Sequence, residues 1–517
     1  MHLIEFFDRG VLINRNGTAF VGGDGQDRIS YAEAFELSHR IAAALNRDGC
    51  SQGTSVAVLG PNHPLVFPAI LGVIRSGATW VAVNSRSSAA DIAELLSVVD
   101  TRVLLHSAAS IDVADKVREA VPGIECVCFD PPAASGWTNF ETWLAPPGTR
   151  VPLPPPDPEA VAALFGTGGT TGKPKAVEVP HRAFEAMIHG LNTHMPEPNP
   201  VHLVAAPLTH AAGALVFPVL SVGGTNVIHD GVDPGEILAS VARNAITRMF
   251  LPPTAIYSVL EDPSCGATDT STLRYFLYGA APMSVHKLKE ALGIFGPVMA
   301  QFYGQVEAPM ICSFLSPADH EQALTKPGLE GRLASCGRPS TVATVAIMDE
   351  SGHLVEAGTR GEIVVRSSLV MKSYRGDPAH TAATTRDDWH ATGDVGYLDG
   401  EGYLYIVDRK RDVVISGGFN VYPSEVEQII WSHPAVKDCA VIGIPHDKWG
   451  EQVTAVVEVT SGAQLDPADL IGMCKQRLGS IKAPKQVIMR ELPRSPAGKV
   501  LKRALRDEYW SGRDRRI

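Results

Sequence analysis

The residues best suited to chemistry lie in one short run at positions 165–175, Phe-Gly-Thr-Gly-Gly-Thr-Thr-Gly-Lys-Pro-Lys. Glycine lets backbone N–H groups approach a ligand closely, threonine hydroxyls donate hydrogen bonds, and lysine neutralises negative charge. Because the run follows an apolar stretch that is typical of a strand, it indicates a loop that holds phosphate groups. The residues that would bind phosphate are Thr167, Gly168, Gly169, Thr170, Thr171, Gly172, Lys173 and Lys175.

Spacing excludes two common phosphate-binding motifs. A Walker A loop requires glycine at position 167 and serine or threonine at position 174, where the chain has Thr167 and Pro174. A dinucleotide-binding Gly-x-Gly-x-x-Gly that starts at Gly166 requires glycine at position 171, where the chain has Thr171. A glycine- and threonine-rich surface turn is the remaining alternative. It is disfavoured because such turns seldom include Lys-Pro-Lys.

The loop resembles the phosphate loop of the adenylate-forming superfamily, which comprises acyl- and aryl-CoA synthetases, the adenylation domains of peptide synthetases and beetle luciferase. Further motifs of this superfamily follow in the expected order between about Ser30 and Lys502, nearly the whole chain. Five motifs in register argue against an accidental match. The branch that the chain resembles is that of the acyl-CoA synthetases, that is, fatty-acid- or aryl-CoA ligases.

Tyr303-Gly-Gln-Val-Glu307 resembles the superfamily's Tyr-Gly-x-Thr-Glu. The resemblance implies that Tyr303 and Gly304 lie near the adenine, and that Glu307 has a catalytic role as a ligand of Mg²⁺, which prefers oxygen donors and stabilises charge in phosphoryl transfer. The chain departs from the motif at Val306, where a threonine usually contacts the α-phosphate. The missing hydrogen bond is worth about 1–3 kcal/mol if its partner stays desolvated, so the efficiency of adenylation is in question.

Three further segments resemble nucleotide-binding motifs of the superfamily. Tyr278-Gly-Ala-Ala-Pro282 is similar to the loop against the adenine, and Trp389-His-Ala-Thr-Gly-Asp394 to the motif whose aspartate accepts from both ribose hydroxyls. Asp408-Arg-Lys-Arg-Asp412 is similar to the motif that combines a ribose-binding arginine with a hinge residue. Any one of these segments alone would indicate an ordinary turn. Their assignment to nucleotide binding therefore depends on their order along the chain. The resemblance assigns nucleotide contacts to Gly279, Ala280, Ala281, Asp394 and Arg409, and the hinge to Arg411.

Two more segments resemble motifs that act on the acid. Pro493-Arg-Ser-Pro-Ala-Gly-Lys499 implies a catalytic lysine, Lys499, that contacts the carboxylate and the α-phosphate and offsets the charge that develops there. Pro207-Leu-Thr-His210 implies that His210 lines the acyl pocket and takes part in catalysis, although Thr209 replaces the usual aromatic residue. Gly417 and Gly418 match the segment that lines the pantetheine tunnel of coenzyme A.

Length and composition limit the classes of protein to which the chain can belong. The 517 residues suffice for more than one domain, and a net charge of −11 excludes a general nucleic-acid binder. Eight scattered cysteines without a Cys-x-x-Cys pair indicate reduced thiols, with neither disulfides nor zinc. The N-terminus has no signal-peptide pattern. Residues 201–229 contain no charged side chain, but two prolines and a Gly-Gly pair favour strand, loop, helix and strand over a membrane span. We therefore expect a cytoplasmic protein.

The predicted fold combines α/β and α+β parts. Up to about residue 340, β-branched runs alternate with helical stretches, which indicates mainly parallel sheets covered by helices. Beyond it, hairpins and then a compact α+β tail follow. The resemblance implies two αβ subdomains plus a small β-barrel, and a small mobile C-terminal lid. We expect residues 1–408 to form the N-terminal adenylation domain, 409–411 the hinge and 412–517 the lid.

The tail carries three local signals. Ser424-x-x-Glu427 is a capping box, and Asp466 before Pro467 is an N-cap. One helical face is expected to be buried. Its residues are Leu470, Cys474, Leu478 and Ile481.

The resemblance implies ATP-dependent activation of a carboxylic acid to acyl-AMP, followed by thioester formation with coenzyme A and release of AMP and pyrophosphate. Small residues at 211–214, with no acidic residue among them, favour a medium or polycyclic hydrophobic acid over an amino acid. Three alternatives stay open: an enzyme that loads a carrier protein, a catalytically silent acyl-nucleotide binding protein, and a luciferase-like monooxygenase. The expected ligands are the acid, ATP, Mg²⁺ and coenzyme A. The sequence leaves the oligomeric state open, a homodimer included.

Overall fold

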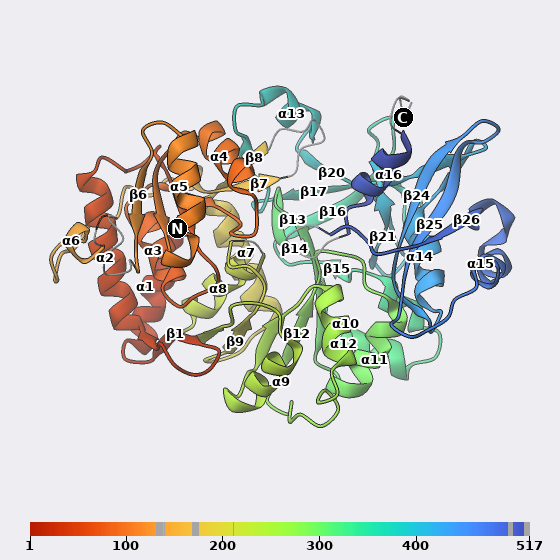
Figure 1. Cartoon of the computed structure of the whole chain (residues 1–517), viewed down its shortest axis with the longest axis horizontal. Coiled ribbons are helices and arrows are strands. Elements are labelled where there is room, and N and C mark those ends of the chain that lie inside the picture. Colours follow the sequence, from red (N-terminus) through yellow and green to blue (C-terminus); the bar gives the residue numbers. More distant parts are fainter. Residues whose placement is uncertain (131–137, 139, 168–174, 210, 495–499, 511–517) are drawn as a thin grey trace.

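The computed structural model of the chain describes residues 1–130, 138, 140–167, 175–209, 211–494 and 500–510. Only the backbone is described for Thr167 and Ala211. Within this part of the chain, helices cover four β-sheets (Figure 1). The fold is therefore the mixed α/β and α+β architecture that the sequence predicts.

A seven-stranded sheet forms the first αβ unit, in the order β18-β8-β7-β4-β3-β5-β6. The strands from β7 to β6 are parallel, whereas β8 and β18 run antiparallel to their neighbours. The phosphate-loop sequence lies between β7 and β8, so the first strand of this antiparallel edge follows the loop directly. The strands are β3 (Ser55–Leu59), β4 (Thr79–Ala82), β5 (Thr101–His106), β6 (Glu125–Cys128), β7 (Val161–Thr167), β8 (Lys175–Pro180) and β18 (Ser373–Tyr374).

A nine-stranded sheet forms the second αβ unit, in the order β15-β14-β13-β12-β11-β9-β10-β1-β2. Its six central strands are parallel, and antiparallel strands close both edges. The strands are β1 (Thr18–Gly22), β2 (Ile29–Ser30), β9 (Val201–Val204), β10 (Thr225–Ile228), β11 (Arg248–Phe250), β12 (Tyr275–Tyr278), β13 (Met299–Gln305), β14 (Ala308–Leu315) and β15 (Arg338–Pro339).

Two five-stranded sheets complete the chain. The first is an antiparallel half-barrel in place of the predicted small barrel, with β16 (Ala343–Met348), β17 (Gly361–Ser367), β19 (Thr385–Arg386), β20 (Trp389–Leu398) and β21 (Leu404–Arg409). The second, the C-terminal sheet, lies at the right of Figure 1 and contains β22 (Val414–Ser416), β23 (Phe419–Val421), β24 (Val436–His446), β25 (Gly450–Val459) and β26 (Gln486–Met489).

The helices cover these sheets and fill the space between the two large ones. They are α1 (Leu3–Asn14), α2 (Tyr31–Arg47), α3 (Val66–Arg75), α4 (Ala89–Val98), α5 (Ile111–Ala120), α6 (Phe140–Trp143), α7 (His181–His194), α8 (Ala211–Ser221), α9 (Pro234–Arg243), α10 (Pro253–Glu261), α11 (Val285–Phe295), α12 (Pro317–Thr325), α13 (Pro378–Ala383), α14 (Pro423–Trp431), α15 (Pro467–Lys482) and α16 (Lys502–Trp510).

The largest hydrophobic cluster joins both αβ units through their shared helices. Phe67 of α3 contacts Phe217 of α8 with ring centroids 5.0 Å apart, and Phe184 of α7 contacts the same ring at 5.7 Å. Trp80 of the seven-stranded sheet and Phe20 of the nine-stranded sheet are completely buried in this cluster. The two units therefore share one core, which fixes the loops at their strand ends relative to one another.

Most predicted elements are confirmed. The segment from 201 to 229 is strand, loop, helix and strand, as expected, and no helix in the described part of the chain is long and apolar enough to cross a membrane. Asp466 caps α15 by accepting from the N–H of Ala468. The helix α3 begins at Val66, after Pro64, which disfavours helical backbone at His63.

The predicted capping box of Ser424 and Glu427 is wrong. α14 begins at Pro423, two residues earlier than a Ser424 N-cap requires, and the fixed φ of Pro423 suits the first helical position. The Ser424 hydroxyl donates instead to the carbonyl of Val407, and Glu427 accepts from the N–H of Val441 at 2.7 Å. Both side chains therefore bind other elements rather than their own helix.

The predicted buried face of α15 is also wrong at one residue, Ile481. Leu470 and Cys474 are completely buried and Leu478 packs against the same cluster, but Ile481 is 48% exposed. The cause is Gly479, whose φ of +78° interrupts the helix and turns its last residues away from the core.

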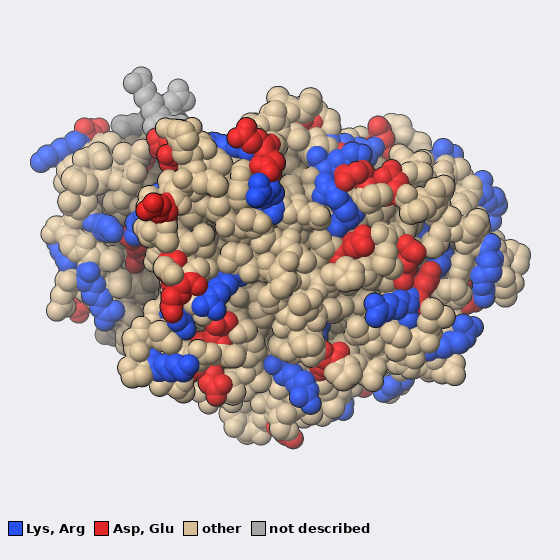
Figure 2. Space-filling view, turned by 180° about the vertical axis from the view of Figure 1, so that it is seen from behind, with Lys and Arg blue, Asp and Glu red and all other residues tan. Residues whose placement is uncertain are grey.

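Acidic and basic side chains are interspersed on the face shown in Figure 2. That face has no extended basic area of the kind that binds nucleic acid, in line with the negative net charge.

We predict that Gly213→Ala destabilises the protein. A Cβ at this position would lie 1.7 Å from the carbonyl oxygen of Leu208, so the backbone would have to move, at a cost of about 1–3 kcal/mol. Gly293→Ala in α11 is the matched control, because a Cβ there meets no atom within 4 Å and alanine favours a helix by up to about 1 kcal/mol. Thermal unfolding should show a lower midpoint for the first variant only; equal midpoints would contradict this role of Gly213.

Candidate active site

The strand topology brings the predicted nucleotide-binding residues together. β12 and β13 are parallel neighbours, so the loop after Tyr278 and the residues Tyr303 and Gly304 meet at the same edge of the nine-stranded sheet. In the half-barrel, the pairing of β20 with β21 places Asp394 directly opposite Arg409. Residues more than 100 positions apart in the sequence thereby converge.

Asp394 is the centre of this group. Its carboxylate is buried, accepts a hydrogen bond from the Tyr303 hydroxyl at 2.8 Å, and lies 3.3 Å from Nε of Arg409. Burial raises the pKa of Tyr303 far above its ordinary value, so the hydroxyl stays protonated and donates. A carboxylate offers about four lone-pair positions. Asp394 therefore retains the capacity to accept from two hydroxyls of a ligand.

The loop after β12 has a strained backbone. Ala280 has a φ of +65°, a conformation that costs a residue with a Cβ roughly 1–2 kcal/mol. A Cβ on the preceding Gly279 would lie 2.7 Å from the carbonyl oxygen of Phe302, so this glycine is required for close packing against β13. Ala281 completes the loop. The strain persists because well-packed neighbours hold both ends of the loop.

A buried histidine anchors the strand that leads into this loop. The Tyr278 hydroxyl lies 2.8 Å from Nε2 of His320, whose Nδ1 lies 2.8 Å from the carbonyl of Ser316. Since a carbonyl only accepts, Nδ1 carries the proton and Nε2 accepts from Tyr278. Burial lowers the pKa of His320 to about 4, so the imidazole is neutral at neutral pH. The sequence motif reveals nothing of this support, because His320 lies 42 residues downstream.

Glu307 lies in the tight turn between β13 and β14. The turn consists of Val306 and Glu307, since Gln305 pairs with Ala308. Gly304 is needed here, because a Cβ would lie 2.6 Å from the backbone nitrogen of Met310. Val306 packs against the main hydrophobic cluster, which accounts physically for an apolar residue at this position.

Tyr374 holds Glu307 in place. Its hydroxyl donates to Oε1 of Glu307 at 2.7 Å, and burial raises its pKa, so it remains a donor. Tyr374 belongs to β18, which pairs with β8, so the Lys175 ammonium lies 5.8 Å from the Tyr374 ring and 3.7 Å from Asp377. The sequence does not predict this role of Tyr374, because the residue belongs to no motif.

The carboxylate of Glu307 fits Mg²⁺. It is half-buried, and Tyr374 fixes its orientation. Mg²⁺ is commonly held by one or two carboxylates together with substrate phosphates and water. Glu307 would therefore share the ion with the phosphates of the nucleotide.

Several predicted site residues lie outside the described part of the chain: Gly168, Gly169, Thr170, Thr171, Gly172, Lys173, His210 and Lys499. The segment just before His210 is described, and Asn62 holds it by accepting from the N–H of Leu208 at 2.9 Å and donating to the carbonyl of Ala206 at 2.9 Å. Asn62 is a second supporting residue that sequence reasoning missed.

The remaining predicted residues lie near the C-terminal sheet. Arg411 lies in the short helical turn Lys410–Asp412 and is exposed to solvent. Gly417 and Gly418 form the turn between β22 and β23 with φ of +60° and +82°. A Cβ on Gly418 would meet no atom within 4 Å, so this residue faces open space.

A cavity of about 280 Å³ lies where the C-terminal sheet meets the second αβ unit. Ala206, Pro207 and Tyr257 line one side, and Asp438 and Arg494 line the other. It adjoins the segment before His210 and the sequence before Lys499. Pro207 and Arg494, which belong to the two segments that the sequence assigns to the acid, therefore both line this cavity.

We predict that Asp394→Asn weakens ATP binding. The variant keeps the shape of the side chain but loses the charge that faces Arg409 and one acceptor for the ribose. Hydrogen bonds to charged groups are worth about 1.5–3 kcal/mol, so the dissociation constant should rise at least about tenfold. Calorimetric titration measures it, with Asp399→Asn in the following turn as the control. Unchanged affinity in Asp394→Asn would refute the ribose assignment.

Comparison with known proteins gives one consistent result. The sequence pattern of the AMP-binding enzyme family matches residues 7–375, and that of the AMP-binding enzyme C-terminal domain matches residues 425–499. The medium/long-chain-fatty-acid–CoA ligase FadD8 of Mycobacterium tuberculosis is 35% identical, covering 97% of this chain and 87% of its own. An indoleacetate–CoA ligase of Aromatoleum aromaticum is 31% identical, covering 97% of each chain.

A solved structure agrees with these relatives. The amide bond synthetase McbA from Marinactinospora thermotolerans superposes with a TM-score of 0.89 at 28% identity, covering 98% of this chain and all of its own. The family pattern spans well over half of the chain, and the relatives cover nearly all of it. The chain therefore belongs to the AMP-binding enzyme family, within the adenylate-forming superfamily.

Proposed function

We propose that the protein is an AMP-forming acid–thiol ligase. The carboxylate of a hydrophobic acid attacks the α-phosphorus of ATP, the bond to the β-phosphate breaks, and acyl-AMP and pyrophosphate form. The thiol of coenzyme A then attacks the acyl carbonyl, and AMP leaves. The observation that carries this proposal is the buried Asp394 carboxylate between Tyr303 and Arg409.

The described residues suit the binding and orientation of the nucleotide. Asp394 accepts from the ribose, Arg409 contacts it, and the Gly279–Ala281 loop lies against the base. Positioning of this kind accounts for much of the rate of phosphoryl displacement. When bound, Mg²⁺ on Glu307 supplies positive charge to the phosphates.

The other roles follow from the motifs. The loop from Thr167 to Lys175 would surround the phosphates. Lys499 would contact the carboxylate and the α-phosphate, and His210 would line the acyl pocket. Gly417 and Gly418 would admit the pantetheine thiol after the C-terminal part turns about Arg411.

The domain division is also proposed. Residues 1–408 form the N-terminal part, 409–411 the hinge and 412–517 the lid. In support, all five strands of the C-terminal sheet follow residue 412, and the two family patterns leave residues 376–424 between them.

The acid is proposed to be hydrophobic. The names of two relatives, a fatty-acid ligase and an indoleacetate ligase, support this class. The small residues at 211–214 support it less than expected, because the space beside Gly213 is filled by the Leu208 carbonyl, and Ala212 and Ala214 lie in the main core cluster.

The decisive experiment measures AMP release with a panel of carboxylic acids, with and without coenzyme A. We expect coenzyme-A-dependent AMP release with medium-chain, aryl or polycyclic acids. Acid-dependent pyrophosphate release without a CoA thioester would point to another acceptor, such as a carrier protein or an amine. Turnover with only acetate-sized acids or amino acids would refute the substrate class.

Tyr374→Phe should raise the Mg²⁺ concentration needed for half-maximal turnover by about 10-fold or more, because residues that orient a metal ligand typically affect metal affinity by this amount. Tyr397→Phe is the control, since Tyr397 stacks on Tyr405 in the half-barrel, 4.8 Å between ring centroids. An unchanged Mg²⁺ requirement in Tyr374→Phe would show that Tyr374 does not position Glu307.

A further inference from the structure

Helix α14 belongs to the proposed lid, yet two of its side chains bind the N-terminal part of the chain. Glu425 accepts a hydrogen bond from Arg360, just before β17 of the half-barrel, at 2.7 Å. Gln428 binds the segment 283–285 of the second αβ unit through its side-chain amide. The helix therefore contacts two elements that lie on the other side of the proposed hinge.

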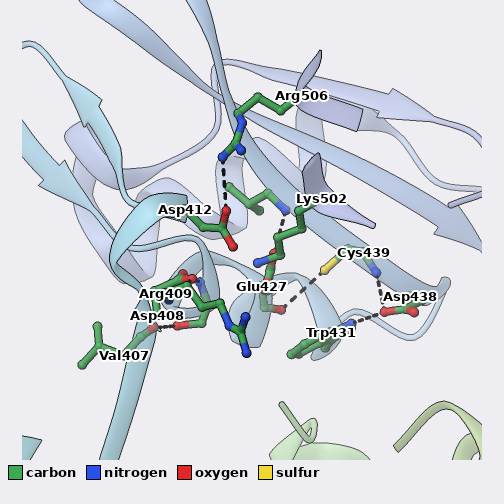
Figure 3. Close-up of polar contacts among 12 residues, drawn as sticks. Val407, Asp408, Arg409, Asp412, Glu427, Trp431, Asp438, Cys439, Lys502 and Arg506 are labelled. Carbon is green, nitrogen blue, oxygen red and sulfur yellow. Dashed lines mark hydrogen bonds and ion pairs between the residues drawn. The ribbon is translucent and has the colours of Figure 1, made fainter. Parts of the chain in front are cut away.

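The side chains that bind outside the C-terminal part share one face of α14. Ser424, whose hydroxyl donates to the carbonyl of Val407, lies four positions before Gln428, and residues at this spacing lie one above the other. Glu427 binds within the C-terminal part instead, where its Oε1 lies 2.6 Å from Nζ of Lys502 (Figure 3). One face of the helix thus belongs to the C-terminal part, and another binds the rest of the chain.

The Gln428 amide makes two hydrogen bonds to one short backbone segment. Its Nε2 donates to the carbonyl of Met283 at 2.9 Å, and its Oε1 accepts from the N–H of Val285 at 3.4 Å. Since a carbonyl only accepts and an N–H only donates, these two partners fix the orientation of the amide. A side chain at this position must therefore supply a donor and an acceptor together, as glutamine does.

The segment bound by this amide ends the proposed adenine loop. Ala280, with its left-handed backbone, lies three residues before Met283, whose side chain is buried. Val285 is the first residue of α11, so its N–H has no partner within the helix. The N–H of Ser284 donates to the Tyr257 hydroxyl at 2.8 Å. Two side chains therefore hold the end of the loop, and one of them comes from the other side of the hinge.

The two ends of the adenine loop differ in what holds them. At its start, Tyr278 bonds to His320 and Gly279 packs against β13, all within the N-terminal part. At its end, the Gln428 amide is in place only while α14 lies where the structure has it. If the lid turns about residues 409–411, the end of the loop loses this support while the start keeps its own.

We propose that Gln428 is a positioning residue: by binding the backbone of Met283 and Val285 while α14 is docked, it fixes the adenine loop and makes nucleotide affinity depend on the position of the lid. This proposal rests on the proposed ligase function and its hinge. Tighter binding of ATP in the docked arrangement, and weaker binding of AMP after the lid turns, suit the order in which the two are bound and released. By linkage, ATP favours the docking of α14 to the same degree.

The test is the isosteric change Gln428→Glu, which keeps the acceptor for Val285 but places a second acceptor against the carbonyl of Met283. In acid-dependent ATP–pyrophosphate exchange at saturating acid, the KM for ATP should rise at least threefold. The rate at saturating ATP should stay within twofold of the wild type, because the loop binds the nucleotide and takes no part in the displacement. An unchanged KM, or a saturating rate reduced more than twofold, would overturn the proposal.

Two matched variants separate this effect from general ones. Gln476→Glu makes the same charge change at an exposed position of α15. Arg360→Met removes the ion pair with Glu425 and the contact with the Tyr422 ring, and a pair as exposed as this one contributes little. The KM for ATP of both should stay within twofold of the wild type. An equal rise in Arg360→Met and Gln428→Glu would indicate general docking of the lid and overturn the assignment to Gln428.

Hydrogen–deuterium exchange gives a readout that needs no substrate. In the ligand-free protein, the backbone of residues 279–288 should take up deuterium at least threefold faster in Gln428→Glu than in Gln476→Glu, while β9 takes it up equally in both. Equal uptake at 279–288, or faster uptake in β9 as well, would overturn the positioning role. If the wild type shows no ATP–pyrophosphate exchange with any acid, the ligase function fails, while selectively faster uptake at 279–288 still supports the role of Gln428.

Discussion

The buried carboxylate of Asp394 is the constraint on which the site depends. It stands on the half-barrel, takes a hydrogen bond from Tyr303 of the nine-stranded sheet and faces Arg409 at the end of β21. A buried carboxylate without donors is strongly unfavourable. The Tyr303 hydroxyl and Asp394 meet only when the nine-stranded sheet and the half-barrel assemble, which couples this group to the fold.

Three further residues support the site through hydrogen bonds between distant elements. Tyr374 orients Glu307 from the seven-stranded sheet, His320 anchors the strand before the Ala280 loop, and Asn62 fixes the segment before His210. Each joins elements far apart in the sequence. Since both αβ units share one hydrophobic core, these long-range hydrogen bonds have little freedom to vary.

The fold was predictable because local patterns encode it. Alternating β-branched runs indicated the parallel sheets, and the order of short motifs indicated which turns converge. Tyr374 and His320 were not predictable, because a single residue gains its role only from strand pairing or packing. The assignments to Lys499, His210 and the phosphate loop remain predictions, since these residues lie outside the described part of the chain.

The local errors have a similar origin. Ser424 and Glu427 form the pattern of a capping box, yet Pro423 shifts the helix start and tertiary partners take both side chains. Ile481 fits the period of a buried helical face, yet Gly479 ends that period. A local rule fails where a neighbouring proline or glycine, or a contact distant in sequence, is energetically stronger.

The left-handed backbone at Ala280 limits how the sequence can diverge at this position. Alanine already tolerates a φ of +65° only at a cost, and a second heavy atom on Cβ would add to it. Valine, isoleucine and threonine are therefore barred by geometry rather than by any contact with a ligand. Glycine, and to a lesser degree asparagine or aspartate, can replace it. Among homologues, the residues found at this position should thus form a narrow set even where their substrates differ.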